Sequence, residues 1–156
     1  MFPMPLLSLL GFAALALISV KRIPEGTVYT LRRLDGQART LGSGTHFVIP
    51  LLERVVHRIS LNGHALAIEA EVLRADRSPL ALRGTVYWQV LDPVRADSVI
   101  ERAEEMIRSN ALDGLRAAEA PESEPVEARN ARIKQVLNAS LHERGVLVTR
   151  VQLALL

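Results

Sequence analysis

The first twenty residues of the chain contain no charged side chain, and Lys21 and Arg22 follow them directly. A helix of this length spans about 30 Å, which matches the hydrocarbon core of a bilayer. We therefore predict a transmembrane anchor over residues 1–22, with Lys21 and Arg22 reaching the headgroups at the membrane interface. The apolar side chains expected to contact lipid are Leu6, Leu7, Leu9, Leu10, Phe12, Leu15, Leu17, Ile18 and Val20.

Two other interpretations of this segment stay open. A cleaved secretory signal peptide would have a basic stretch before its apolar run and small residues at the cleavage site, and residues 1–20 match neither feature well. A monotopic or interfacial helix would have a polar face, which this segment lacks. Lysine and arginine follow the segment and none precedes it, so the positive-inside rule predicts a single-pass protein whose body lies in the cytoplasm.

Composition excludes several classes of function. The net charge is +2 and only six residues are aromatic, which is unlike the basic surfaces and stacking platforms of nucleic-acid-binding proteins. The chain has no cysteine, so it has no disulfide framework, no thiolate metal site and no cysteine nucleophile. We expect no nucleic-acid partner.

Residues 23–156 predict one α+β domain. Apolar and polar residues alternate with period two in the first half, which predicts antiparallel strands at 27–33, 47–49, 55–61, 66–72 and 80–90. Apolar residues then recur every three or four positions, which predicts a helix capped by Ser98 and Glu101 and a second helix from Val126. Gly145 is expected to end that helix, before a final strand over 146–155. The predicted fold is an antiparallel curved sheet with two C-terminal helices and a final strand.

No group of residues predicts catalysis or metal binding. The four histidines are not spaced as metal ligands, and Gly42-Ser43-Gly44 lacks the pattern of a nucleophile elbow. Glu69 and Glu71 share one face of a strand and would act as an acid/base pair only inside a cleft. We therefore predict a non-enzyme with no catalytic residue, cofactor, metal or small-molecule substrate. An anchored hydrolase using Glu69 and Glu71, or Ser43, is the least favoured alternative.

Several motifs in order resemble the SPFH/Band 7 family, which includes stomatin, prohibitin, flotillin and the bacterial HflK/HflC proteins. The similar segments are IPEGT at 23–27, LGSGTHFVIP at 41–50, LERV at 52–55, ADRSP at 75–79, VYWQVLDP at 86–93 and RGVLV at 144–148. The resemblance covers the whole body of the chain. It implies an SPFH/Band 7-like domain over residues 23–156, in a short form that lacks the family's C-terminal coiled coil.

The resemblance implies structural rather than catalytic roles for the matching residues. Phe47 and Ile49 are expected to plug the sheet, and Asp92-Pro93 to end a strand ahead of the helices. The family-signature structural residues are Pro24, Gly26, Gly44, His46, Phe47, Pro50, Asp92, Pro93 and Gly145.

The function implied is that of a scaffold in the bacterial inner (plasma) membrane. Such a protein associates laterally, as a homo-oligomer or a hetero-oligomer with a longer SPFH protein, and organises lipids or membrane proteins. Its expected partners are the lipid bilayer and, where it modulates proteolysis, a membrane protease. The alternative is a non-scaffolding adaptor or regulatory subunit of a larger SPFH homologue or of a membrane protease complex.

Overall fold

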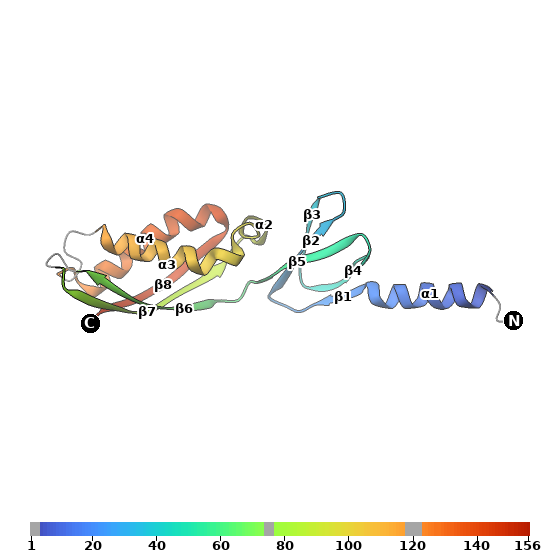
Figure 1. Ribbon diagram of the computed structural model, residues 1–156, viewed down its shortest axis with the longest axis horizontal. Coiled ribbons are helices and arrows are strands. Elements are labelled where there is room, and N and C mark those ends of the chain that lie inside the picture. Colours follow the sequence, from blue (N-terminus) through green and yellow to red (C-terminus); the bar gives the residue numbers. More distant parts are fainter. Residues whose placement is uncertain (1–3, 74–76, 118–122) are drawn as a thin grey trace. The chain divides into compact units, whose positions relative to one another are not determined.

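The computed structural model describes residues 4–73, 77–117 and 123–156. The chain divides into two compact units, unit 1 (Met1–Ser60) and unit 2 (Leu61–Leu156), and each is described by itself. Both units contain antiparallel strands. Unit 1 begins with one helix, whereas unit 2 has several helices and the final strand (Figure 1). The predicted α+β class is therefore confirmed. The predicted boundary between residues 22 and 23 stays a prediction.

Unit 1 is a helix followed by two small sheets. Strand β1 pairs with β4, and the second sheet has the order β3-β2-β5. The elements are α1 (Met4–Ser19), β1 (Val20–Ile23), β2 (Thr27–Arg33), β3 (Ala38–Leu41), β4 (Gly44–Phe47) and β5 (Glu53–Ser60).

The N-terminal helix is shorter than the predicted anchor. The helix ends at Ser19, because Val20 already pairs with Phe47 in the β1–β4 sheet. Lys21 and Arg22 follow in the same strand, β1. The 16 residues of the helix rise about 24 Å, less than the roughly 30 Å of a hydrocarbon core. Among the helices of the described residues, none is long and apolar enough to cross a membrane. The predicted transmembrane helix over residues 1–22 is therefore not supported.

The core of unit 1 is small and differs from the prediction at one strand. Its buried cluster is Ile23, Leu31, Leu41 and Val48. The prediction that Phe47 and Ile49 plug the sheet is wrong, because Phe47 is 57 % exposed and the buried residue is Val48. Strand β4 also covers Gly44–Phe47 rather than 47–49, since its register is fixed by β1.

Unit 2 is one three-stranded sheet with helices packed on it. The strand order is β6-β7-β8, with both pairings antiparallel. The elements are β6 (His64–Leu73), β7 (Pro79–Val90), α2 (Pro93–Ala96), η1 (Ile100–Arg102), α3 (Ala103–Arg116), α4 (Val126–Leu141), η2 (His142–Arg144) and β8 (Val146–Leu155). The final strand lies where the sequence predicts it. In the expected turn at 75–79, Ala75 and Asp76 lie outside the described residues.

The helices of unit 2 bury the apolar faces that their periodicity predicts. The fully buried residues are Ala103, Ile107, Ala111 and Leu115 on α3, and Ile133, Leu137 and Leu141 on α4. Val136, also expected in the core, is 40 % exposed. Asn138 fastens α4 to β8, because its amide donates to Val148 O at 3.0 Å and accepts from Val148 N at 2.8 Å.

The start of the helical region is capped earlier than predicted. Asp92 Oδ1 accepts hydrogen bonds from the backbone N–H groups of Val94 and Arg95, and Pro93 occupies the first position of α2. The predicted Ser98–Glu101 capping box is wrong, since the Ser98 hydroxyl donates to Arg95 O. An Asp-Pro pair is the stronger signal, because the carboxylate accepts the unpaired N–H groups and proline needs none.

Candidate functional site

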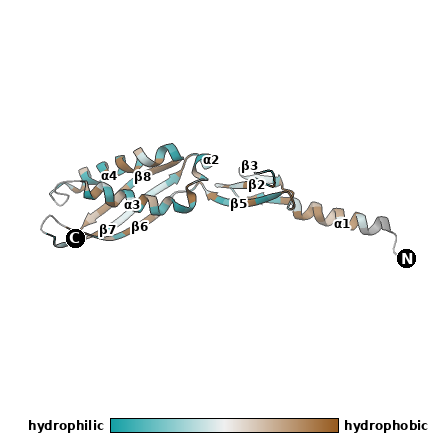
Figure 2. Ribbon diagram, turned by 45° about the horizontal axis from the view of Figure 1, so that its top comes forward, coloured by the Kyte–Doolittle hydropathy of each residue, from teal (hydrophilic) through white to brown (hydrophobic). Residues whose placement is uncertain are grey.

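The most unusual surface of the chain is helix α1, which is apolar on every side. Figure 2 shows the described part of this helix in hydrophobic colours along its length. Its exposed fractions are 62 to 78 % for Leu9, Leu10, Phe12, Leu17 and Ile18, and 42 % for Leu15. The side chains of Leu6 and Leu7, also predicted to contact lipid, lie outside the described side chains. A helix without a polar face is stable when an apolar environment surrounds it.

The polar groups at the end of this helix are satisfied within unit 1. The Ser19 hydroxyl donates to Leu15 O at 2.7 Å, and Ser19 O accepts from Val48 N at 2.8 Å. A hydroxyl bonded to its own helix leaves no open donor, so it can enter an apolar environment at little cost. The Ser19–Val48 bond also holds the end of α1 beside the segment that follows β4.

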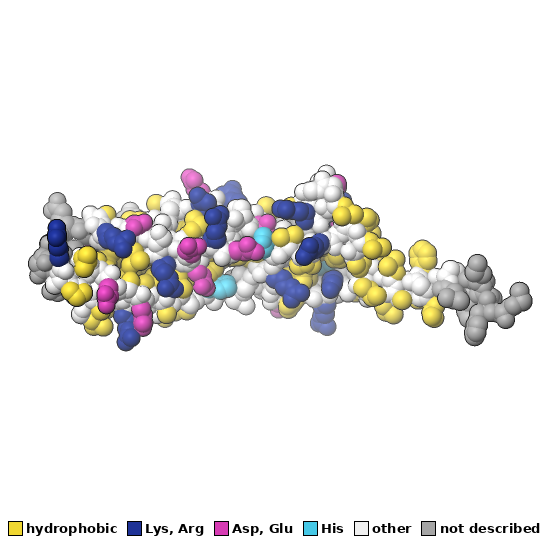
Figure 3. Space-filling model, viewed as in Figure 1, with side chains coloured by type: hydrophobic (Ala, Val, Ile, Leu, Met, Phe, Trp, Pro, Cys, Tyr) yellow, Lys and Arg dark blue, Asp and Glu magenta, His cyan; other side chains and the backbone are white. Residues whose placement is uncertain are grey.

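That segment continues the apolar surface. Loop 49–52 is closed by a hydrogen bond from Leu52 N to Ile49 O at 3.0 Å. Leu51 is 74 % exposed, and Leu52, Ile49 and the preceding Phe47 are also exposed. On the face drawn in Figure 3, hydrophobic side chains gather along α1 and on the adjoining end of unit 1, with lysines and arginines next to them.

Basic residues accompany this apolar surface. Lys21 and Arg22 are exposed on β1, where they pair with His46 and Thr45 of β4. They lie in a strand rather than at the end of a spanning helix. Their predicted place at a membrane interface stays a prediction.

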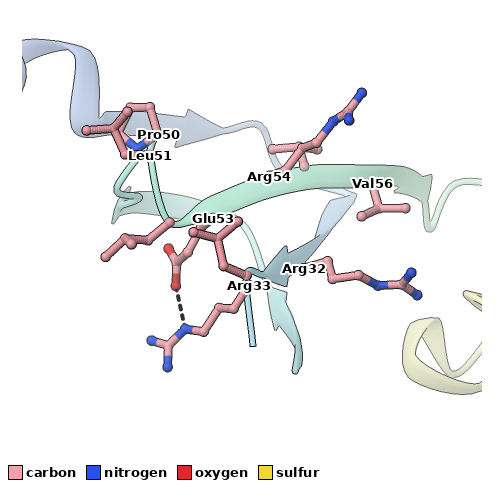
Figure 4. Close-up of a pocket in the computed structure, with 10 residues that line it drawn as sticks. Arg32, Arg33, Pro50, Leu51, Glu53, Arg54 and Val56 are labelled. Atoms are coloured by element: carbon pink, nitrogen blue, oxygen red, sulfur yellow. Dashed lines mark hydrogen bonds and ion pairs between the residues drawn. The ribbon is translucent and has the colours of Figure 1, made fainter. Parts of the chain in front are cut away.

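A cavity of about 560 Å³ lies between β2, β5 and loop 49–52. Its lining residues are Arg32, Arg33, Leu34, Pro50, Leu51, Leu52, Glu53, Arg54, Val55 and Val56. Figure 4 shows Arg32 and Arg54 extending on either side of Val56, and Glu53 turned towards Arg33. The lining therefore combines guanidinium groups with exposed aliphatic side chains.

Glu53 is the one acidic residue among these lining residues, and it forms ion pairs with two arginines. Its buried carboxylate lies 2.9 Å from Arg33 Nε and 3.6 Å from Arg39 Nη1. A second hollow of about 350 Å³ adjoins the first, shares Arg33, Leu34, Leu52 and Glu53 with it, and adds Asp35. The larger cavity has the more positive lining.

The signature residues of unit 1 lie at turns and strand ends. Thr27 N donates to Pro24 O, which closes a turn with Gly26 at φ 72°. Gly44 begins β4 with φ 125°. His46 Nε2 lies 2.9 Å from Gly42 O. Pro50 lines the larger cavity.

The signature residues of unit 2 meet at one point. Gly145 O accepts hydrogen bonds from Leu91 N at 2.8 Å and from Asp92 N at 3.2 Å. Gly145 itself has φ 75° and ends η2. Asp92, Pro93 and Gly145 therefore join the end of β7 to the start of β8, which is a structural role.

The candidate catalytic groups are not brought into a cleft. Glu69 is exposed and pairs with Arg83 at 2.9 Å across the β6–β7 sheet, and the hollow beside Glu69 and Glu71 is an open surface on the same sheet. His64 stacks on Trp88 with ring centroids 4.3 Å apart. Within the described ranges, no group of three or more His, Cys, Asp or Glu residues could hold a metal ion.

Sequence reasoning missed the arginines of the 560 Å³ cavity as a group. Arg32 and Arg54 lie 22 positions apart in the chain and become neighbours only because β2 pairs with β5, where Arg32 is opposite Arg54. The sequence did contain one signal: each of these arginines stands next to an apolar residue in its own strand, which places it on the polar face of that strand. Without the register, that signal does not show which arginines are neighbours.

Comparison with known proteins gives a consistent result. The SPFH domain / Band 7 family matches residues 21–154. A stomatin homolog of Pyrococcus horikoshii is 28 % identical over 155 residues, covering 95 % of this chain and 56 % of the homolog; a stomatin homolog of Pyrococcus abyssi shows the same values. An uncharacterized protein of Schizosaccharomyces pombe is 29 % identical over 99 residues, covering 63 % of this chain and 28 % of that protein. The chain thus spans between about a quarter and just over half of these relatives.

Proposed function

Because the chain belongs to the SPFH domain / Band 7 family, as its motifs predict, we propose that it is a membrane-associated scaffold. It attaches to the cytoplasmic face of a bacterial inner membrane and associates laterally with copies of itself or with a longer SPFH protein. In this role it organises neighbouring lipids and proteins, including a membrane protease.

The observation that carries this proposal is the exposed, predominantly apolar surface of α1. Each strongly apolar residue that leaves water contributes about 1.5–3 kcal/mol, so several on one helix favour a lipid environment. We propose that α1 inserts its exposed apolar side chains into the hydrocarbon region of the bilayer. Loop 49–52 and Phe47 adjoin its end and add to the apolar contact.

Lateral assembly is supported by the family and by mass action. The match to stomatin homologs favours a generic scaffold role. Confinement to a surface raises the local concentration of each copy, so weak contacts between domains suffice for association.

Membrane attachment through α1 is tested by substituting exposed residues. Leu10→Arg with Leu17→Arg is expected to abolish flotation of the full chain with neutral phosphatidylcholine vesicles, since each arginine costs about 2.5–3.5 kcal/mol inside the hydrocarbon. The thermal midpoint in mild detergent should not change, because both leucines are more than 70 % exposed.

The matched control is Leu73→Arg with Val94→Arg, which adds the same charge at exposed apolar residues of unit 2. This pair should float like the wild type. If the α1 pair floats as well as the control, attachment through α1 is wrong.

Assembly is tested by mass photometry of the full chain in mild detergent, with crosslinking in native membranes as a check. A large homo-oligomer, or a mixed oligomer with a longer SPFH protein, is expected. A monomer, or a one-to-one complex with a larger protein, would contradict the scaffold and favour the adaptor alternative.

A further inference from the structure

Two arginines occupy opposite positions on neighbouring strands of unit 1 and extend on either side of Val56 (Figure 4). Arg32 of β2 is directly opposite Arg54 of β5, and residues that are opposite in an antiparallel pair project to the same side of the sheet. Both side chains are exposed, and neither guanidinium has a hydrogen bond or ion pair with any residue that the structure describes. Like charges directly opposite each other destabilise a sheet, so this pair has no evident structural benefit.

The surroundings leave this positive charge uncompensated. Glu53 is next to Arg54 in the chain, yet its buried carboxylate faces Arg33 and Arg39 on the other side of the strand. No other acid lines the 560 Å³ cavity. The cavity is therefore able to receive an anionic group between Arg32 and Arg54.

The same cavity has an exposed aliphatic rim. Leu34, Leu51, Leu52 and Val56 line it and are each at least 40 % exposed. The Ser19–Val48 hydrogen bond holds the end of α1 beside the segment that leads into loop 49–52. A ligand that fits both parts has an anionic head and an apolar chain.

We infer that this cavity binds the phosphate of an anionic phospholipid, with Arg32 and Arg54 as its ligands and Leu51 and Leu52 against the acyl chains. Guanidinium groups suit phosphate because their paired N–H donors match its oxygens. A free phosphate ester would use the arginines and leave the leucine rim in water, whereas a membrane lipid uses both. The inference names the lipid class for the proposed function and rests on it.

The test compares two vesicle compositions with the full chain. Wild type should partition more strongly into phosphatidylcholine vesicles that contain phosphatidylglycerol than into neutral phosphatidylcholine vesicles. Arg32→Gln with Arg54→Gln should reduce partitioning into the anionic vesicles by roughly tenfold to thirtyfold. Its binding to neutral vesicles should be unchanged, because that binding depends on α1.

The matched control is Arg108→Gln with Arg144→Gln, which removes the same charge from exposed positions of unit 2. This control should keep the preference for anionic vesicles. Arg32→Lys with Arg54→Lys keeps the charge but loses the paired donors, and it should fall between the wild type and the Gln pair.

The thermal midpoint provides a second readout, because it distinguishes a ligand-binding role of Arg54 from a role in stabilising the fold. Without lipid, Arg54→Gln should leave the thermal midpoint unchanged or raise it, since it removes a like-charge contact. A large decrease would mean that Arg54 supports the fold, and would overturn the assignment of Arg32 and Arg54 as ligands.

The remaining outcomes distinguish failure of the lipid site from failure of membrane attachment. Equal losses for the Gln pair and the unit 2 control would show diffuse charge attraction and overturn the site. Wild-type binding that is the same for both vesicle types would also overturn it, while membrane attachment would stand. Complete competition by soluble glycerophosphate would identify a free phosphate ester as the ligand and overturn the lipid assignment. No flotation with either vesicle would overturn membrane attachment and the inference together.

Discussion

Gly145 occupies a backbone position that leaves no room for a Cβ atom. Its φ is 75°, and a Cβ added there would lie 2.3 Å from Asp92 O and 3.1 Å from Arg95 Cβ. Its carbonyl also accepts the two hydrogen bonds that tie Leu91 and Asp92 to the start of β8. The backbone around this residue has little room to move without breaking those bonds.

We expect Gly145→Ala to lower the free energy of unfolding by about 2–4 kcal/mol, through the left-handed backbone and the overlap with Asp92. Urea unfolding followed by Trp88 fluorescence measures this. Gly63→Ala is the control, since nothing lies within 4 Å of its added Cβ, and it should change stability by less than about 0.5 kcal/mol. Equal effects at the two glycines would contradict the steric argument.

Sequence reasoning succeeds at single residues where the cause is local. Gly145 was predicted because a helix end needs a residue that tolerates positive φ. The burial of Val48 instead of Phe47 was not predicted, because it depends on which residue of β1 lies opposite. The arginine pair at 32 and 54 was missed for the same reason, since register is a property of two strands and not of one.

At the scale of elements, an ion pair joins the segment before α4 to both long helices. Arg132 donates to the Glu124 carboxylate at 3.1 Å from Nε and 2.8 Å from Nη2, and it also donates to Gly114 O near the end of α3. These hydrogen bonds hold the pKa of the Glu124 carboxyl below its ordinary value. The pair therefore makes the packing of the two helices sensitive to acid.

We expect the stability of unit 2 to fall less on acidification in Glu124→Gln than in the wild type. A carboxyl with a lowered folded pKa contributes fully above its ordinary pKa, near 4.5, and loses that contribution as pH falls through the lower folded value. Thermal midpoints from about pH 6 to about pH 3 should converge at the acid end.

Glu71→Gln is the control, because it removes one negative charge from an exposed position of β6. It should leave the pH dependence close to that of the wild type. A pH profile for Glu124→Gln that runs parallel to the wild type at every pH would contradict the role of the Glu124–Arg132 pair.

Elements with strong periodicity were predictable, and their ends were less so. The buried faces of α3 and α4 follow directly from the spacing of apolar residues. The length of α1 did not follow, because an uncharged run does not show where strand pairing begins, and β1 takes over at Val20. The cap is Asp92, directly before Pro93, rather than the predicted Ser98–Glu101 pair.

At the scale of the whole molecule, the fold class was predictable from the order of the strand and helix patterns. Strand and helix periods in order imply an α+β protein. The predicted domain over residues 23–156 stays a prediction, and the structure divides the chain into compact units between residues 60 and 61. Compactness depends on long-range pairing, such as β2 with β5 and β7 with β8, and periodicity carries no information on which strands pair.

Each unit has fully buried residues of its own, and we predict that the two units unfold separately. Leu31 is fully buried in the cluster of unit 1, and Ile107 is fully buried in unit 2. The only tryptophan of the chain, Trp88, is buried in unit 2 and reports on the folding of that unit. Amide hydrogen exchange in β2 reports on unit 1.

Leu31→Ala should therefore destabilise unit 1 by about 2–5 kcal/mol, through lost contacts and a cavity, and accelerate exchange in β2. The Trp88 transition in urea, measured in mild detergent, should hardly move. Ile107→Ala serves as the matched substitution, since it should shift the Trp88 transition by a similar free energy and leave exchange in β2 unchanged. If Leu31→Ala displaces the Trp88 transition as far as Ile107→Ala does, the units unfold as one cooperative body.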